Sequence, residues 1–110
     1  MAGKFELRKG AKGGFSFVLK ASNGQVILQS EHYESKASAV NGIASVQRNA
    51  ADGRRFDRRT SKNGKPYFVL IATNGQVIGQ REMYESAASM ENGIASVQKN
   101  APDAPTADLT

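Results

Sequence analysis

The sequence predicts an α+β protein in which two tandem β-β-β-α repeats form one continuous antiparallel sheet with both helices on one face. Residues 3–50 align with residues 54–101 without a gap, and 28 of these 48 positions are identical. Each repeat carries short apolar stretches of period two, which are typical of half-buried strands, and then one stretch of helical periodicity. A unit of about 50 residues is marginal alone, so we expect the two units to share one sheet and one core.

Period-two patterns place three strands in each repeat. In the first repeat, Phe5–Arg8 alternates apolar and polar residues, and Phe15–Ala21 presents one apolar face. Asn23-Gly24 then predicts a hairpin with a type I′ turn, which needs positive φ at both central residues, and Val26–Leu28 begins a third strand. The second repeat follows the same plan with Phe56, Phe68, Leu70, Asn74-Gly75 and Val77-Ile78.

A helix is predicted after each third strand. Ser35 and Ser86 stand at N-cap positions, and Asn49 and Asn100 stand where a left-handed C-terminal cap would fall. One helical face of the first repeat is apolar, which predicts that it packs on the sheet; its residues are Ala39, Gly42, Ile43, Val46 and Ala50.

The stretch NGIASVQ, at residues 41–47 and again at 92–98, places Asn-Gly in the middle of each helix. Glycine in a helix interior costs ~1 kcal/mol relative to alanine. We therefore predict that Gly42 and Gly93 lie where the helix backbone approaches the sheet or the sister helix closely.

The domain boundaries follow from the repeat. Residues 1–53 form the first repeat, residues 54–110 form the second repeat with the C-terminal tail, and the two together form one compact domain. Segment Arg54–Arg59 follows the first helix and opens the second unit, so it is placed to serve both. The tail APDAPTADLT contains Pro102 and Pro105, and it is either a frayed end or a short strand at a sheet edge, where proline is tolerated.

The motifs NGQVI, YES…NGI.SV..NA and PDAPTADLT closely resemble those of the YegP-like family of uncharacterised bacterial proteins, over nearly the whole chain and in both repeats. The resemblance implies units of three strands, a helix and a further strand, joined in one sheet with the final strand exchanged between them. On this chain it implies that Arg54–Arg59 closes the first unit and Ala104–Leu109 the second. It implies no activity.

Composition limits the classes of function. The formal net charge is +5 and cysteine is absent, so disulfides, thiolate metal sites and a cysteine nucleophile are excluded. No apolar run approaches the ~18–20 residues needed to cross a bilayer, and MAGKFELRKG lacks the apolar core of a secretory signal. We therefore expect a cytoplasmic protein without a membrane partner, monomeric because the duplication supplies an internal dimer-like symmetry.

The residues that carry most enzyme chemistry are sparse. His32 is the only histidine, and its counterpart in the second repeat is Met83, so the repeat does not require it. Lys12-Gly13-Gly14 resembles a phosphate loop only superficially, because no helix is predicted to open after it. We predict a non-enzymatic protein with no catalytic residues, no cofactor and no metal site.

A polar helical stripe is the first candidate binding surface. It repeats in both units and packing does not readily account for it, so it is interpreted as a paired recognition surface for a protein partner. The alternatives are a solvated face and helix-to-helix packing about a pseudo-two-fold axis. The residues of the stripe are Asn41, Ser45, Arg48, Asn92, Ser96 and Lys99.

A basic segment is the second candidate. Residues 54–65 hold six basic residues and one acidic residue, and Leu7 of the first repeat corresponds to Arg58, so the charge is specific to the second repeat. An extended segment with arginines and an aromatic would suit a nucleic-acid backbone. The alternative is an edge strand whose charges prevent aggregation. The candidate nucleic-acid contacts are Arg54, Arg55, Arg58, Arg59, Lys62 and Lys65.

Overall fold

The computed structural model describes residues 3–10, 12–80 and 84–110. The two repeats have the same order of elements, and a short 3₁₀ helix, Gly53–Arg55, joins them. The elements are β1 (Lys4–Lys9), β2 (Phe15–Lys20), β3 (Val26–Gln29), α1 (Lys36–Asn49), β4 (Phe56–Thr60), β5 (Pro66–Ile71), β6 (Val77–Gln80), α2 (Ala87–Asn100) and β7 (Thr106–Asp108).

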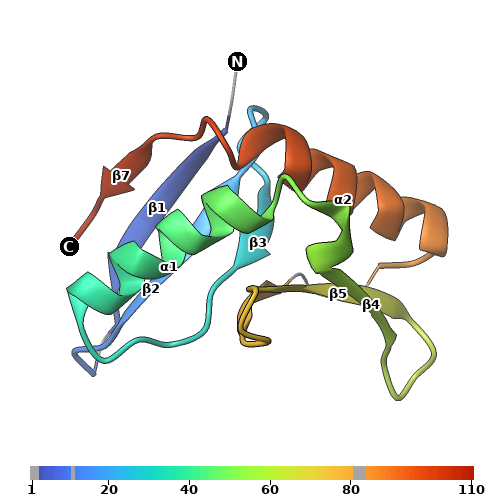
Figure 1. Cartoon of the computed structure of the whole chain (residues 1–110), viewed down its shortest axis with the longest axis horizontal. Helices are drawn as coiled ribbons and strands as arrows, with labels where there is room; N and C mark the ends of the chain where they lie inside the picture. The colour runs from blue at the N-terminus through green and yellow to red at the C-terminus, as the bar shows by residue number, and fades with distance from the viewer. Residues whose placement is uncertain (1–2, 11, 81–83) are drawn as a thin grey trace.

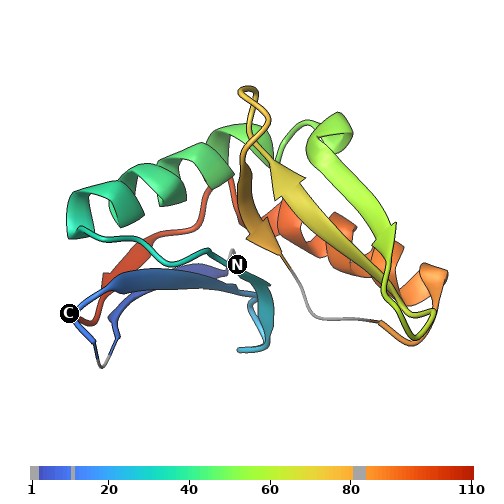
Figure 2. The same ribbon diagram turned by 90° about the horizontal axis from the view of Figure 1, so that it is seen from below.

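The strands form one seven-stranded sheet in the order β4-β5-β6-β3-β2-β1-β7 (Figures 1 and 2). The predicted α+β fold, with two tandem repeats in one sheet, is confirmed. The sheet is not antiparallel throughout, because β7 pairs with β1 in parallel. The chain leaves α2 through a short loop and reaches the outer edge of the first unit, where β7 runs in the same direction as β1. The sequence pattern did not indicate this parallel pairing.

The two units meet at the pair Gln29↔Gln80, which joins β3 to β6. The residues paired outward from this point are equivalent in the two units, so the joint lies on a pseudo-two-fold axis. The row of paired residues that crosses the sheet is Asp57, Val69, Gln80, Gln29, Val18, Glu6 and Ala107.

The hairpins fall where Asn-Gly predicted them, but the predicted type I′ turn is wrong. Gly24 has φ +86°, while no residue other than glycine has positive φ in the described part of the chain. The Gly24 N–H donates to Ala21 O, and the Ala21 N–H donates to Gln25 O, both at 2.9 Å. This pattern matches a three-residue loop that ends in a left-handed glycine, and Gly75 at φ +85° repeats it.

Both helices begin as predicted and end differently. The Ser35 and Ser86 hydroxyls each accept a hydrogen bond from the backbone N–H three residues later, at 3.1 Å, so both N-caps are confirmed. The predicted left-handed cap at Asn49 is wrong, because Asn49 is helical and the C-cap, Ala50, has φ −64°. The same holds for Asn100, where the C-cap is Ala101. Both asparagines are buried instead, and their side chains bond back into the helix.

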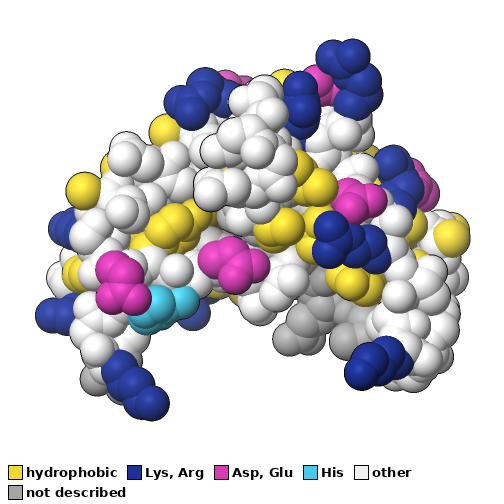
Figure 3. All heavy atoms as spheres, turned by 60° about the horizontal axis from the view of Figure 1, so that its bottom comes forward, with side chains coloured by type: hydrophobic (Ala, Val, Ile, Leu, Met, Phe, Trp, Pro, Cys, Tyr) yellow, Lys and Arg dark blue, Asp and Glu magenta, His cyan; other side chains and the backbone are white. Residues whose placement is uncertain are grey.

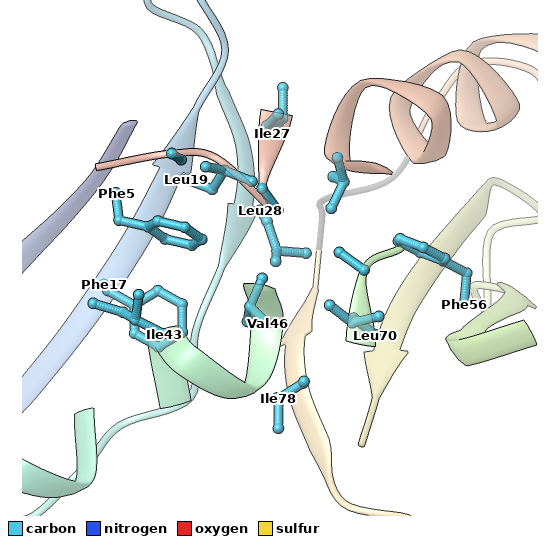
Figure 4. Packing of buried hydrophobic residues seen from close by; sticks show 14 of the residues in the cluster. Phe5, Phe17, Leu19, Ile27, Leu28, Ile43, Val46, Phe56, Leu70 and Ile78 are labelled. Carbon is cyan, nitrogen blue, oxygen red and sulfur yellow. The ribbon is translucent and has the colours of Figure 1, made fainter. Parts of the chain in front are cut away.

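One core lies between the helices and one face of the sheet, as predicted. In Figure 4, Val46 of α1, Leu28 of β3 and Ile78 of β6 lie between the phenylalanines of the two units. Each helix contacts strands of both units: α1 packs on β1, β2, β5 and β6, and α2 on β3 and β5. The helices therefore hold the two halves of the sheet together.

Asn41-Gly42 lies inside α1 and Asn92-Gly93 inside α2, as predicted. The group that needs the space beside each glycine is a tyrosine, rather than the sheet backbone or the sister helix. A Cβ on Gly42 would lie within 3 Å of the Tyr33 ring and hydroxyl, and a Cβ on Gly93 would meet Tyr84 in the same way. Tyr33 stacks on Phe17 at 6.2 Å, and Tyr84 stacks on Phe68 at 6.1 Å.

The C-terminal tail forms a strand rather than a frayed end, and it pairs with the first unit. Strand β7 is shorter than the range Ala104–Leu109 that the family resemblance implied. Pro105 precedes it, and its carbonyl oxygen accepts the Phe5 N–H at 2.8 Å. Strand β4 pairs only with β5 and leaves its other edge open. Strand β4 does not include the whole predicted range Arg54–Arg59. It begins at Phe56, because Arg54 and Arg55 lie in the 3₁₀ helix.

Two helix–hairpin grooves as the candidate functional site

The polar stripe of α1 faces the β5–β6 hairpin of the other unit. Figure 2 shows this hairpin rising beside the C-terminal end of α1. Between them lies a groove of about 380 Å³, here called the α1 groove. Its lining residues are Ser45, Arg48, Asn49, Asp52, Arg55, Ala72, Thr73 and Asn74.

The polar stripe of α2 faces the β2–β3 hairpin of the first unit in the same way. The α2 groove measures about 320 Å³. Six of the eight positions that line it are equivalent to positions in the α1 groove. Its lining residues are Ala21, Ser22, Asn23, Asn92, Ala95, Ser96, Lys99 and Asn100.

Each groove is therefore built from two repeated motifs that lie far apart in the sequence. The helix comes from one unit and the Asn-Gly hairpin from the other, because the pseudo-two-fold axis brings each helix across the joint. The structure brings five of the six predicted stripe residues into these two grooves, and four of them occupy equivalent positions: Ser45, Arg48, Ser96 and Lys99. Asn92 also lines the α2 groove, and Asn41 lines a neighbouring lobe of the α1 groove.

That lobe, about 250 Å³ in volume, shares Ser45, Ala72 and Asn74 with the α1 groove. Tyr33, which fills the space above Gly42, also lines it. Burial raises the pKa of the Tyr33 phenol, and the nearby Glu31 carboxylate adds to the effect. The phenol is therefore neutral at physiological pH and offers a hydrogen-bonding hydroxyl.

One asparagine at the end of each helix, paired with a serine one turn earlier, gives each groove hydrogen-bonding groups. Asn49 donates from Nδ2 to Ser45 O at 2.8 Å and to Ser45 Oγ at 3.2 Å. Asn100 makes the same bonds to Ser96, at 2.7 and 3.2 Å. Each asparagine thus donates from Nδ2 to the serine one turn earlier, and leaves the serine O–H free to donate to another group.

The hairpin asparagines serve the turn itself. Asn74 Oδ1 accepts from the Gln76 N–H at 3.0 Å, and Asn23 Oδ1 accepts from the Gln25 N–H at the same distance. The asparagines therefore hold the hairpin tips in one conformation, beside Thr73 in one groove and Ser22 in the other.

Each groove carries one cationic side chain at an equivalent position, Arg48 in the α1 groove and Lys99 in the α2 groove. Both are exposed, and neither has an acidic side chain within ion-pair distance in residues 3–10, 12–80 and 84–110. The α1 groove also holds Asp52, whose pKa is lowered by hydrogen bonds from the Arg54 side chain and backbone. Asp52 pairs with Arg54 at 3.1 Å and with Arg55 at 3.7 Å.

The basic segment is largely neutralised by acidic neighbours. Besides the two arginines that Asp52 holds, Arg58 pairs with Glu91, Arg59 with Asp57, and Lys65 with Glu85. The six cations of residues 54–65 thus lie among four carboxylates. Of these six, only Lys62 has no ion-pair partner in the described part of the chain. On the face shown in Figure 3, lysine and arginine side chains are scattered rather than gathered into one patch.

The open edge of β4 explains why the second repeat carries this charge. Leu7 of β1 is 1% exposed, and β7 covers that edge of the sheet. Arg58 is the equivalent residue at the edge that no strand covers, and its side chain is 45% exposed. Charge at an uncovered edge opposes strand-to-strand association.

The outer face of the sheet carries a second ionic cluster, around Glu6. Its carboxylate lies 2.5 Å from Arg8 Nη2, 3.1 Å from Lys20 Nζ and 3.6 Å from Lys4 Nζ. Hydrogen bonds from Arg8 and Lys20 lower the pKa of Glu6 to about 2. Glu6 is only 7% exposed, so the cluster holds a nearly covered charge that its neighbours compensate.

The only histidine of the sequence, His32, lines neither groove. His32 is exposed and lies against Gly14, where a Cβ would meet its ring; Met83 lies outside the described residues. Within those residues, no group of three histidine, aspartate or glutamate side chains is placed to hold a metal ion. None of the described helices has the length and apolar character needed to cross a membrane.

Comparison with known proteins decides the family. A family model described as a domain of unknown function, DUF1508, matches residues 11–57 and again residues 61–108. The chain belongs to the DUF1508 family. The two matches reproduce the repeat seen in the sequence, and the resemblance to YegP-like proteins is confirmed.

Several bacterial proteins match this chain over all or nearly all of their length. A UPF0339 protein of Bordetella pertussis is 56% identical over all of this chain and 98% of its own length, and the YegP protein of Shigella flexneri is 52% identical over all of both chains. The solution structure of Escherichia coli YegP, a protein of unknown function, superposes with a TM-score of 0.95 at 51% identity, covering 100% of this chain and 95% of that one. A UPF0339 protein of Shewanella oneidensis superposes with a TM-score of 0.94 at 49% identity, covering 100% and 93%. The family description assigns no enzymatic activity.

Sequence reasoning missed half of each groove. The sequence patterns assign Asn23 and Asn74 only to turns and Asn49 and Asn100 only to caps, and they give Ser22 and Thr73 no role. One signal was available: the hairpin motif is repeated between the units as closely as the helical stripe is. Nothing in the sequence, however, showed that the hairpin of one unit lies against the helix of the other.

Proposed function

We propose that this DUF1508 protein is a non-enzymatic binding module whose sites are the two helix–hairpin grooves, and that its partner is a protein. The observation that carries the proposal is the convergence of two repeated polar motifs. The helical stripe and the hairpin tip are repeated between the units, neither belongs to the apolar core, and the fold brings them together twice.

The chemistry of the grooves suits recognition better than catalysis. Their linings are rich in amides and hydroxyls with one unpaired cation each, the α1 groove adds the ion pair of Asp52 with Arg55, and the only histidine of the sequence lies elsewhere. Such groups donate and accept hydrogen bonds without changing protonation near neutral pH.

The basic segment supports a nucleic-acid role less well. Five of its six cations already have carboxylate partners, and the open edge of β4 accounts for their presence. Exposed ion pairs contribute only ~0–1 kcal/mol each, so phosphates would still compete for these arginines. The experiment that tests the proposal therefore includes a nuclease arm.

The test is affinity capture from an extract of the native host, with nuclease treatment of half the sample. The groove variant Ser45→Glu/Ser96→Glu places one negative charge in each groove. Its matched control, Val40→Glu/Ala88→Glu, places the same charges on exposed positions of the same helices outside the grooves. Circular dichroism checks that both variants are folded.

We expect a defined protein to bind the wild type and the control, to be lost from the groove variant, and to survive nuclease treatment. Retention of every bound component by the groove variant would remove the grooves as the site. Loss of all binding after nuclease treatment would favour the basic segment instead.

A further inference from the structure

We propose that the α1 groove binds an extended acidic segment of a protein, and that the α2 groove does not, because the protein's own N-terminal segment already satisfies it. The inference rests on the proposed function and adds to it the chemistry of the ligand and the difference between the two sites. It follows from a difference between two equivalent buried asparagines, Asn49 and Asn100, in the hydrogen bonds that they make.

Asn49 has an open acceptor. The residue is only 8% exposed, and its Nδ2 is occupied by Ser45. Its Oδ1 accepts no hydrogen bond from any residue that the structure describes. Every fully buried side-chain nitrogen or oxygen in those residues has a partner. The Asn49 Oδ1 is therefore reached by solvent, and the α1 groove is the surface that Asn49 lines.

Asn100 shows which donor such an oxygen takes. Its Oδ1 accepts the backbone N–H of Gly3 at 2.9 Å, in a buried hydrogen bond. The residue equivalent to Gly3 in the second unit is Arg54, and its N–H donates to Asp52 Oδ1 instead, also at 2.9 Å. The chain thus supplies a peptide N–H to one asparagine and leaves the other without one.

Ser45 completes a pair of groups that matches a peptide unit. Its oxygen accepts from Asn49 Nδ2, while its own O–H donates to no residue that the structure describes. A serine hydroxyl that donates to a carbonyl oxygen, beside an amide oxygen that accepts an N–H, is complementary to the two polar groups of a peptide backbone. Hydrogen bonds of this kind give affinity to extended peptides.

The charges of the groove select the side chain. Arg48 is exposed, lies at the groove and has no carboxylate partner among the described residues, so an acidic side chain of the ligand would complete an ion pair there. Asp52 lies in the same groove and is ionised, and it repels a dense polyanion. A DNA backbone also carries no N–H for Asn49, which favours a peptide with isolated carboxylates over nucleic acid.

The test is a titration of the ¹⁵N-labelled full chain with a blocked hexapeptide of alternating alanine and aspartate. We expect shifts at Ser45, Arg48, Asn49, Thr73 and Asn74, with the α2 groove unchanged. A hexapeptide with asparagine in place of aspartate should bind roughly tenfold more weakly, and Arg48→Gln should cause a similar loss, because each change removes a charge-assisted hydrogen bond.

Lys9→Gln is the matched control, since it removes an exposed cation that lines neither groove and has no ion-pair partner among the described residues, and it should leave peptide affinity unchanged. Equal shifts in both grooves, equal affinity for the asparagine peptide, no shift at the α1 groove, or displacement of the peptide by a DNA oligonucleotide would each overturn the inference. If the peptide fails while Ser45→Glu/Ser96→Glu still loses the captured protein, only the ligand assignment falls. If the groove variant retains every partner, the proposed function falls with it.

Discussion

Gly42 and Tyr33 explain why an Asn-Gly dipeptide is retained inside each helix. The glycine leaves room for the tyrosine, whose ring stacks on Phe17 and whose hydroxyl reaches the space that a Cβ would fill. The same arrangement recurs at Gly93 and Tyr84. Helix propensity alone favours alanine at both glycines by ~1 kcal/mol, so packing must outweigh propensity here.

Gly42→Ala should therefore destabilise the protein by about 1–2 kcal/mol, because overpacking costs typically exceed the gain in helix propensity. In a Tyr33→Ala background the same substitution should cost at least ~1 kcal/mol less, because the tyrosine contacts are gone and only Phe17 Cε2, 3.0 Å from the added Cβ, must still give way. Urea denaturation of the four proteins in this cycle measures both values. A stabilising effect of Gly42→Ala in the wild type would contradict the assigned role of Tyr33.

Glu6 makes a pH-dependent contribution of defined sign. Its folded pKa, about 2, lies below its ordinary value of 4.5, so the carboxylate stabilises the fold fully above pH 4.5, and this stabilisation is lost as the pH falls toward 2. Glu6→Gln should be less stable than the wild type at pH 7, and the difference should vanish near pH 2. Denaturation midpoints across this range test it, and a difference that persists at pH 2 would exclude the ionic origin.

At this scale the sequence predicted the residues whose role depends on near neighbours. The N-caps at Ser35 and Ser86 and the mid-helix glycines are confirmed because their signals lie within one helical turn. The caps at Asn49 and Asn100 were wrong, since each asparagine is still helical and its side chain bonds to a serine one turn earlier. The turn type was wrong because a single left-handed glycine suffices in a three-residue loop.

The two repeats differ in sequence at the symmetry axis of the sheet and at its two edges. At the axis, Leu28 of β3 is fully buried, and its counterpart in β6 is Gly79. A Cβ on Gly79 would lie 2.8 Å from Leu28 Cδ2, so the shared centre has room for one leucine and not for two.

Exchanging the two residues should preserve the fold. Leu28→Gly leaves a cavity and Gly79→Leu overfills the centre, so each single variant should lose about 3 kcal/mol. The double variant Leu28→Gly/Gly79→Leu places one leucine in the equivalent position and should fall within about 1–2 kcal/mol of the wild type. Chemical denaturation measures all three, and additive losses in the double variant would show that the centre is not symmetric.

One edge of the sheet is covered and the other is open, so the equivalent residues Leu7 and Arg58 should differ in how well they tolerate substitution. Leu7→Arg would bury a charge in the hydrophobic core, at the strand that β7 covers, and should cost about 3 kcal/mol or more. Arg58→Leu removes only an exposed ion pair with Glu91, so its stability should change by less than about 1 kcal/mol. Thermal unfolding checks both, with light scattering to detect the self-association that an apolar open edge promotes. Equal costs would contradict the assignment of the two edges.

The sequence predicted the number and order of the first six strands, because period-two patterns and turn residues are local. It left the tail open between a frayed end and an edge strand, and it missed the parallel direction of β7. Both features depend on where α2 delivers the chain, which no local pattern records. The exchange of the last strand was implied only by the family resemblance.

For the whole molecule, duplication creates sites that neither unit contains. Each groove takes a helix from one unit and a hairpin from the other, so the pseudo-two-fold axis explains both why the motifs are repeated and why there are two grooves. The sequence singled out the helical half of each groove, since exposed polar residues repeated between units stand out. It could not pair that half with a hairpin, because the relative placement of the units is a tertiary property.

The most direct test of this account maps the binding of the captured protein partner onto the ¹⁵N-labelled chain. We predict that the largest amide shifts fall on the helix–hairpin grooves, at Ser45, Thr73 and Asn74 above all, and that Val40→Glu/Ala88→Glu leaves them unchanged. Shifts centred on Arg54, Arg59 and Lys62, with the grooves unperturbed, would contradict it.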